Sequence, residues 1–237
     1  MRNTFIIAKK ESKAYFSSPM AYVIGAVFLA LTGYMFVSSV SNPFPEATIR
    51  GWVVTSTFIF VLWSPVLTMR LLAEEQKLGT LELLMTSPVK DYEVVIGKYL
   101  ATLLILIGTL FPTIWYVILL YWFGNPDLWP LLTSYLGLIL FGGATLAIGL
   151  LASSLTSNQV LAAVMSFGLL LLLTLTNKAA LVTVGLSATI LEEISLTAHF
   201  DDFARGIVDI GNVTYYLSVI GIFVFSAIRS LESRRWR

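Results

Sequence analysis

The sequence predicts an all-α integral membrane protein that crosses the bilayer six times. Apolar residues make up 57% of its 237 residues and charged residues only 12%, about half of the roughly 25% found in soluble domains. Uncharged stretches recur along the chain, and several exceed the roughly 20 apolar residues that one membrane crossing needs. The scarcity of charge excludes a disordered chain and a basic surface for nucleic acid. The absence of cysteine excludes disulfide bonds and thiolate metal sites.

Six apolar spans, separated by charged or polar segments, follow from this pattern. The predicted spans are residues 20–40, 52–69, 99–123, 131–152, 160–176 and 213–228. Each is expected to be a helix, because backbone polar groups in lipid must be hydrogen-bonded within their own segment. The block 128–177 supplies two of the spans, because its only polar run, Ser153–Gln159, can form a turn. Residues 179–191 are too few to cross, so a re-entrant or interfacial helix is predicted there.

The Lys and Arg residues predict the orientation. Twelve of the fifteen fall on one side of this topology: Arg2, Lys9, Lys10, Lys13, Arg70, Lys77, Lys90, Lys98, Arg229, Arg234, Arg235 and Arg237. Because cytoplasmic loops carry the excess of positive charge, both termini are predicted to be cytoplasmic, in an inner or plasma membrane. A single span within 128–177 would place the C-terminus outside, and the basic cluster at residues 234–237 argues against that alternative.

The predicted spans contain no Asp, Glu, Lys, Arg or His. Proton-coupled transporters, voltage sensors and ion pumps need such groups inside the membrane, so these classes are disfavoured. Small residues such as Gly142, Gly143 and Gly149 are interpreted as sites of close helix packing. The chain has no G-x-x-x-x-G-K-[ST] loop for nucleotide phosphates and no catalytic motif. We therefore expect neither an enzyme nor a bound cofactor, and energy must come from another subunit.

The outer loop around His199, the one histidine, leaves two interpretations open. Its acidic neighbours are Glu192, Glu193, Asp201 and Asp202. One imidazole with carboxylates can bind a divalent ion, although scattered acids are a weak pattern. The favoured interpretation is a solvated loop and a short helix whose Phe200, Phe203 and Ile207 face the membrane or a partner. The residues predicted to form an outer partner contact or gate are Phe200, Asp201, Phe203 and Arg205.

The loop between spans two and three carries the richest pattern. Residues 70–78 are predicted to form a helix that leaves the membrane, and Gly79 can end it in the left-handed conformation. Thr80 can then cap a second short helix that Pro88 closes. Asp91 is predicted to cap the helix that follows.

The predicted second helix carries four apolar side chains: Leu81, Leu83, Leu84 and Met85. So short a helix cannot form a core of its own. These side chains therefore either lie on lipid or dock into a groove on a partner protein.

This loop resembles the signature of ABC-2 type transporter permeases. The matching residues are Glu74-Glu75, Gly79-Thr80, Glu82, Leu83-Leu84, Pro88 and Gly97-Lys98. The similarity covers essentially the whole chain. The segments 199–209, 215–217 and 230–236 are most similar to gliding-motility-type and nitrous-oxide-reductase-maturation permease subunits.

The resemblance implies a type V exporter-like permease fold and several partners. The helix after span two would be a coupling helix in a cleft of a cytoplasmic ABC ATPase, present as a dimer. Residues 2–18 would lie along the inner interface, and 179–191 would re-enter the membrane from outside. A second permease copy or a related permease is implied, and an auxiliary subunit with a large extracytoplasmic domain is associated with the gliding-type subgroup.

The resemblance and the loop pattern together assign an ATPase-coupling interface. Its residues are Arg70, Glu74, Glu75, Gly79, Thr80, Glu82, Leu83, Leu84 and Pro88. The three glutamates are expected to pair with basic residues of the ATPase, and the two leucines to form the buried contact. The expected function is the permease subunit of an exporter. The alternative is a scaffold with the same fold that transmits force to a periplasmic partner and transports nothing.

Overall fold

The computed structural model describes residues 2–41, 48–80 and 89–234, and within these ranges the chain is all-helical with no strand. The elements in order are α1 (Arg2–Phe16), α2 (Pro19–Val40), α3 (Arg50–Thr68), α4 (Ala73–Leu78), α6 (Asp91–Leu110), η1 (Phe111–Thr113), α7 (Ile114–Phe123), α8 (Leu128–Leu155), α9 (Gln159–Ala180), α10 (Leu186–Ile194), η2 (Ala198–Phe200), α11 (Asp201–Ala204) and α12 (Ile210–Arg234).

Six helical segments are long and apolar enough to cross a membrane. They are Pro19–Val40, Arg50–Leu78, Asp91–Phe123, Leu128–Leu155, Gln159–Ala180 and Ile210–Ser233. The prediction of six spans is confirmed at the level of length and composition. A turn in the long fourth block is also confirmed, but it is shorter than the predicted Ser153–Gln159, because α8 continues to Leu155 and α9 begins at Gln159. The Asn158 side chain accepts hydrogen bonds from the backbone N–H groups of Val160 and Leu161, which caps the start of α9.

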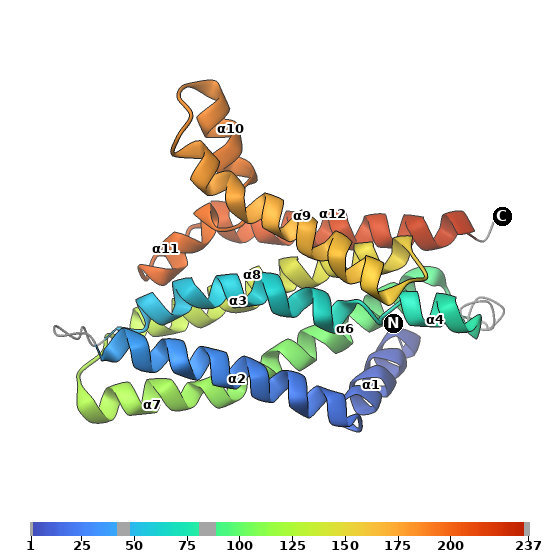
Figure 1. The fold of residues 1–237 in the computed structure, drawn as a ribbon, viewed down its shortest axis with the longest axis horizontal. Helices are drawn as coiled ribbons and strands as arrows, with labels where there is room; N and C mark the ends of the chain where they lie inside the picture. Colours follow the sequence, from blue (N-terminus) through green and yellow to red (C-terminus); the bar gives the residue numbers. More distant parts are fainter. Residues whose placement is uncertain (1, 42–47, 81–88, 235–237) are drawn as a thin grey trace.

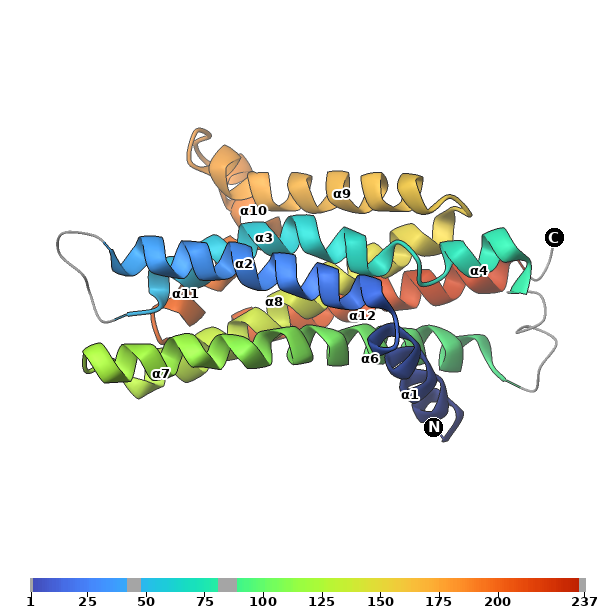
Figure 2. The same cartoon turned by 60° about the horizontal axis from the view of Figure 1, so that its bottom comes forward.

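The long helices run beside one another along the length of the molecule (Figure 1). Most of α3 and α8 is buried, whereas only a small part of α2, α9 and α12 is buried. We call one end of the bundle the basic end. It holds α1, α4, the start of α6, the turn between α8 and α9 and the end of α12 (Figures 1 and 2). Every described Lys and Arg lies in these elements or in the segment directly before one of them, except Arg50, Lys178 and Arg205, which belong to the opposite end.

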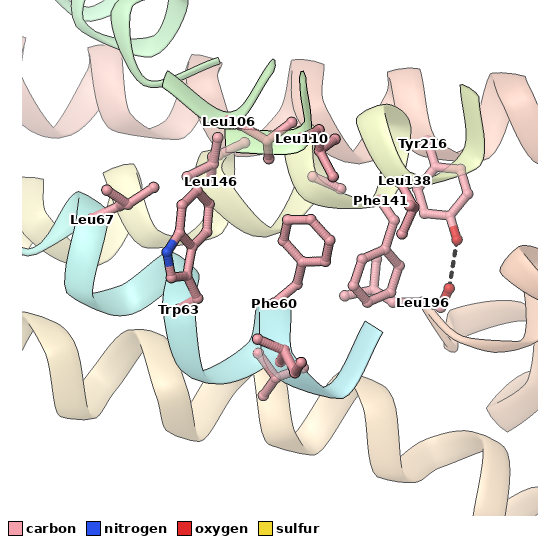
Figure 3. Packing of buried hydrophobic residues seen from close by; sticks show 14 of the residues in the cluster. Phe60, Trp63, Leu67, Leu106, Leu110, Leu138, Phe141, Leu146, Leu196 and Tyr216 are labelled. Atoms are coloured by element: carbon pink, nitrogen blue, oxygen red, sulfur yellow. Dashed lines mark hydrogen bonds between the residues drawn. The ribbon is translucent and has the colours of Figure 1, made fainter. Parts of the chain in front are cut away.

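Aromatic side chains fill the centre of the bundle (Figure 3). The rings of Phe28, Phe60, Trp63, Phe141 and Phe200 form a connected series, with neighbouring centroids 5.0 to 6.3 Å apart. Aromatic pairs at such separations add stabilisation beyond their buried area. The series joins helices α2, α3 and α8 to the segment before α11.

The glycines of α8 allow close packing, as predicted. A Cβ atom on Gly142 would collide with Leu106 of α6, and one on Gly149 would collide with Thr68 of α3. The Ser64 hydroxyl donates to Thr145 Oγ1 at 2.6 Å, which links α3 and α8 by a buried polar contact. Small residues and interhelical hydrogen bonds are the usual means of helix association in lipid.

Several boundaries differ from the prediction. The third helix begins at Asp91 rather than Tyr99, so Lys98 lies within it. Asp91 is the first helical residue, and the N-cap is Lys90 instead. The Lys90 backbone N–H donates to Glu93 Oε2 at 3.2 Å.

The predicted re-entrant segment 179–191 also divides differently. Its first two residues end α9, and α10 begins only at Leu186, after Gly185 turns the chain with a φ of 82°. α10 lies at the tip of α9 and projects from the bundle (Figure 1).

Candidate functional site

A buried lysine connects three elements at the basic end. The Lys98 ammonium of α6 lies 2.8 Å from Glu11 Oε1 of α1 and 2.8 Å from Glu75 Oε1 of α4. Its side chain is only 2% exposed, whereas the carboxylates are 29% and 22% exposed. A buried ammonium is costly unless it is paired and hydrogen-bonded. We call these three residues the Lys98 triad.

The N-terminal helix crosses α6 at close range. A Cβ atom on Gly97 would lie 2.9 Å from Ile7 Cγ2 and 3.0 Å from the carbonyl oxygen of Thr4. One turn earlier along α6, the Asn3 side-chain amide donates to Glu93 Oε2 at 3.2 Å. The side-chain-free surface at Gly97 therefore lets α1 contact the backbone of α6 directly, next to the Lys98 triad.

The short helix α4 is held against the end of α8. The Ser153 hydroxyl oxygen accepts hydrogen bonds from the backbone N–H groups of Leu72 and Ala73, both at 3.0 Å. The Gln76 side-chain amide donates to the carbonyl oxygen of Ser154 at 3.0 Å. The first N–H groups of a helix have no partner within it, so a serine from α8 here takes the place of a local cap.

The described part of the coupling interface agrees with the loop prediction at the end of the first helix. Gly79 ends α4 with a φ of 69°, in the left-handed region, as expected. The start of that helix differs from the prediction: α4 begins at Ala73 rather than residue 70, and Arg70 lies exposed in the turn between α3 and α4. The predicted second helix, with Glu82, Leu83, Leu84 and Pro88, lies outside the described residues. Thr80, just before it, is helical rather than a cap, and its hydroxyl donates to the Glu75 carbonyl oxygen at 3.4 Å.

The two described glutamates of the predicted interface, Glu74 and Glu75, do not share one environment. Glu75 is predicted to pair with the ATPase, but in the structure it pairs with Lys98 of its own chain. The Glu75 side chain points toward Lys98, because the buried ammonium is stabilised by a second carboxylate in addition to Glu11. Glu74 lies one position away and is partly exposed. It remains a candidate for contact with another subunit.

At the opposite end, Phe200 and Phe203 are buried in the core rather than facing the membrane or a partner. They are 1% and 0% exposed, and the Cβ position of Gly137 in α8 lies 2.7 Å from Phe203 Cβ. The Thr133 hydroxyl donates to the Phe203 carbonyl oxygen at 2.9 Å. The predicted orientation is wrong for both phenylalanines, because α8 offers a side-chain-free surface that they fill. Ile207 is 53% exposed, as predicted.

The polar residues of the outer loop make local contacts. Asp202 Oδ2 accepts a hydrogen bond from Asn212 at 2.8 Å. Burial raises the pKa of the Asp201 carboxyl, and Arg205 and Arg50 act in the opposite direction. The His199 ring stacks on Tyr215 with centroids 3.8 Å apart. Within the described ranges no group of three metal-ligating side chains comes together, so the suggested metal site finds no support.

The comparison with protein families decides what kind of protein has this geometry. The chain matches the family described as ABC-2 family transporter protein over residues 5–220. The chain belongs to the ABC-2 transporter family. It is a multi-pass membrane component of an ABC-2 type transporter, and such permeases are typically membrane subunits without an ATPase domain. No curated protein matches this ABC-2 permease.

Two groups at the basic end of the ABC-2 permease were not singled out from the sequence. Glu11 looks like one surface acid among lysines, and Ser153 like part of a polar turn. In the sequence, Lys98 is one of many positive charges on the inner side and part of the Gly97-Lys98 pair that resembles the permease signature. One signal could have pointed to the site: Lys98 follows Gly97 directly and precedes an uninterrupted apolar stretch, where an exposed charge is not expected.

Proposed function

We propose that this chain is the permease subunit of an ABC exporter and couples ATP hydrolysis by a separate cytoplasmic ATPase to movement of its spans. The observation that carries the proposal is the Lys98 triad, because it joins α4 to α1 and α6 beside the loop whose sequence resembles a coupling helix. Family membership supports an ATPase partner, and the sequence has no phosphate-binding loop of its own.

The proposed path of coupling begins at the loop of residues 79–90. ATP binding closes two ATPase subunits, and each moves the loop of one permease. The loop continues from α4, which is hydrogen-bonded to the end of α8. The turn before α4 continues directly from α3. Movement of the loop therefore reaches α3 and α8, the two most buried helices of the bundle.

The partners proposed for this subunit follow from the same reasoning. The basic end faces the cytoplasm, where the ATPase dimer binds. The six spans form half of a transporter, so a second copy or a related permease completes it. An auxiliary subunit with a large extracytoplasmic domain is the proposed partner at the opposite end.

A non-transporting scaffold is the second candidate, favoured by the apolar surface next to α10. Leu181, Val182, Val184 and Leu186 are 78% to 92% exposed, and α10 projects from the bundle (Figure 1). Such a surface suits an extracytoplasmic partner that receives force. Reconstituted vesicles separate the candidates: ATP-dependent movement of a solute or lipid across the bilayer supports the exporter, and hydrolysis without any movement supports the scaffold.

The coupling role is tested by a Leu83→Asp, Leu84→Asp double variant. Two charges in a buried contact are expected to reduce ATPase co-purification by more than tenfold, since each desolvated carboxylate costs several kcal/mol. The hydrolysis that depends on the permease should fall in parallel. The matched control is Val182→Asp, Val184→Asp, which places the same charges on exposed residues of the opposite end.

The control variant should retain the ATPase. Normal co-purification and hydrolysis with the Leu83 and Leu84 changes would contradict the coupling role. If the Val182 and Val184 changes release an extracytoplasmic partner and the Leu83 and Leu84 changes do not, the two ends have separate functions, as proposed.

A further inference from the structure

A cavity of about 330 Å³ lies at the basic end, between α1, α2, the end of α3 with α4, and α6. This volume falls within the range of small-molecule sites, roughly 300–1,000 Å³. One wall is apolar and comes from three of the spans; it includes Met20, Ala21, Ile24, Val66, Leu67 and Ile105. Met20 and Val66 are 38% and 37% exposed. The apolar wall therefore reaches the outside of the bundle.

The other wall is polar and has unused hydrogen-bonding groups. Of the two carboxylate oxygens of Glu75, Lys98 pairs with Oε1. The second oxygen, Glu75 Oε2, and the Tyr15 hydroxyl are both buried without a hydrogen-bond partner in the described part of the chain. Buried polar groups are nearly always hydrogen-bonded, so two orphaned oxygens lining one cavity call for an explanation.

The charges of the polar wall define what the cavity would accept. Glu11, Glu74 and Glu75 bring three carboxylates against the two cations Arg70 and Lys98. A carboxylate oxygen can only accept, so the ligand must donate a hydrogen bond to Glu75 Oε2. Arg70 is exposed, and none of the ion pairs among the described residues includes it. Burial raises the pKa of the Tyr15 hydroxyl to about 12, and Arg70 lies near enough to act in the opposite direction.

We propose that this cavity binds the headgroup of an aminophospholipid. The primary ammonium donates to Glu75 Oε2 and Tyr15 Oη, the phosphate faces the Arg70 guanidinium, and the acyl chains lie against the apolar wall. A lipid fits better than a soluble amine, because half of the lining is apolar and opens to the outside of the spans. The proposal depends on membrane embedding and not on coupling to an ATPase, so either can fail alone.

The ligand class is tested on the purified full-length chain in detergent, with three probes and the unfolding temperature as the measure of binding. Lysophosphatidylethanolamine should stabilise the protein saturably. Lysophosphatidylcholine, which has the same phosphate and chain but no N–H donor, should bind at least tenfold more weakly. Free phosphoethanolamine should give no shift. Equal binding of the two lysolipids would overturn the ammonium assignment, and equal binding of phosphoethanolamine would overturn the lipid assignment.

Two variants test the position of the site. Tyr15→Phe removes one orphaned oxygen and should weaken lysophosphatidylethanolamine binding about tenfold, the effect of one hydrogen bond to a charged group. Without ligand, its unfolding temperature should stay the same or rise, because a buried unpaired hydroxyl is lost. Ala21→Leu narrows the cavity and should abolish binding, whereas Ala26→Leu on the exposed face of the same helix should not. Wild-type affinity in both Tyr15→Phe and Ala21→Leu would overturn the proposal.

Discussion

Lys98 is the residue whose environment differs most from its sequence context. It lies in the first turns of a membrane-spanning helix, yet solvent reaches only 2% of its side chain. A buried ammonium destabilises the fold unless carboxylates replace its hydration. Glu11 and Glu75 supply that replacement from two other elements. A single ammonium therefore links α1 and α4 to α6.

Replacing this ammonium should destabilise the basic end. In Lys98→Met, Glu11 and Glu75 lose their shared partner and repel each other, and we expect the free energy of unfolding to fall by about 2–3 kcal/mol. The measurement is thermal or denaturant unfolding in detergent. Lys77→Met, which changes an exposed lysine of α4, should change stability by less than about 0.5 kcal/mol.

A triple variant tests the cause. Adding Glu11→Gln and Glu75→Gln to Lys98→Met removes the repulsion, so part of the lost stability should return. If Lys98→Met and Lys77→Met behave alike, the Lys98 triad does not hold the three elements together.

At the scale of elements, α4 depends entirely on its neighbours. It has six residues, and isolated helices shorter than about 12 residues are marginal in water. Its first N–H groups are capped by Ser153 of α8, and Gln76 binds the next carbonyl of the same helix end. α8 thus determines where α4, and the loop that follows it, begins.

Removing the hydroxyl of Ser153 should loosen α4. We expect Ser153→Ala to cost about 1–2 kcal/mol, the usual effect of losing a helix cap, and to speed amide hydrogen exchange at Leu72 and Ala73. Ser154→Ala is the matched control, because the Ser154 hydroxyl donates to the Leu151 carbonyl oxygen of its own helix. Equal exchange in the two variants would show that Ser153 does not cap α4.

At the scale of the whole molecule, the two ends of the bundle differ in charge. Both the first helix and the end of the last helix lie at the basic end, together with most described Lys and Arg residues (Figure 2). An even number of spans requires the termini to share a side, and the positive charge predicts that this side is the cytoplasm.

Single-cysteine labelling can test this orientation, because the natural chain has no cysteine. In intact cells, an impermeant maleimide should label Val184→Cys and should not label Lys10→Cys, Lys77→Cys or Ser157→Cys until the membrane is opened. All four positions are exposed in the structure. Labelling of Lys10→Cys and Lys77→Cys from outside would reverse the orientation and remove the ATPase from the basic end.

The sequence alone determined the six spans, the presence of a turn within Ser153–Gln159 and the end of α4 at Gly79. These depend on local quantities: the length of an uncharged stretch, a run of polar residues, and a left-handed conformation that favours glycine. Only the tertiary structure decided which distant residues meet. Lys98 and Glu11 are 87 residues apart, and Phe203 reaches Gly137 across the bundle. Such pairings depend on where helices cross, and no local pattern in one helix specifies the surface of another.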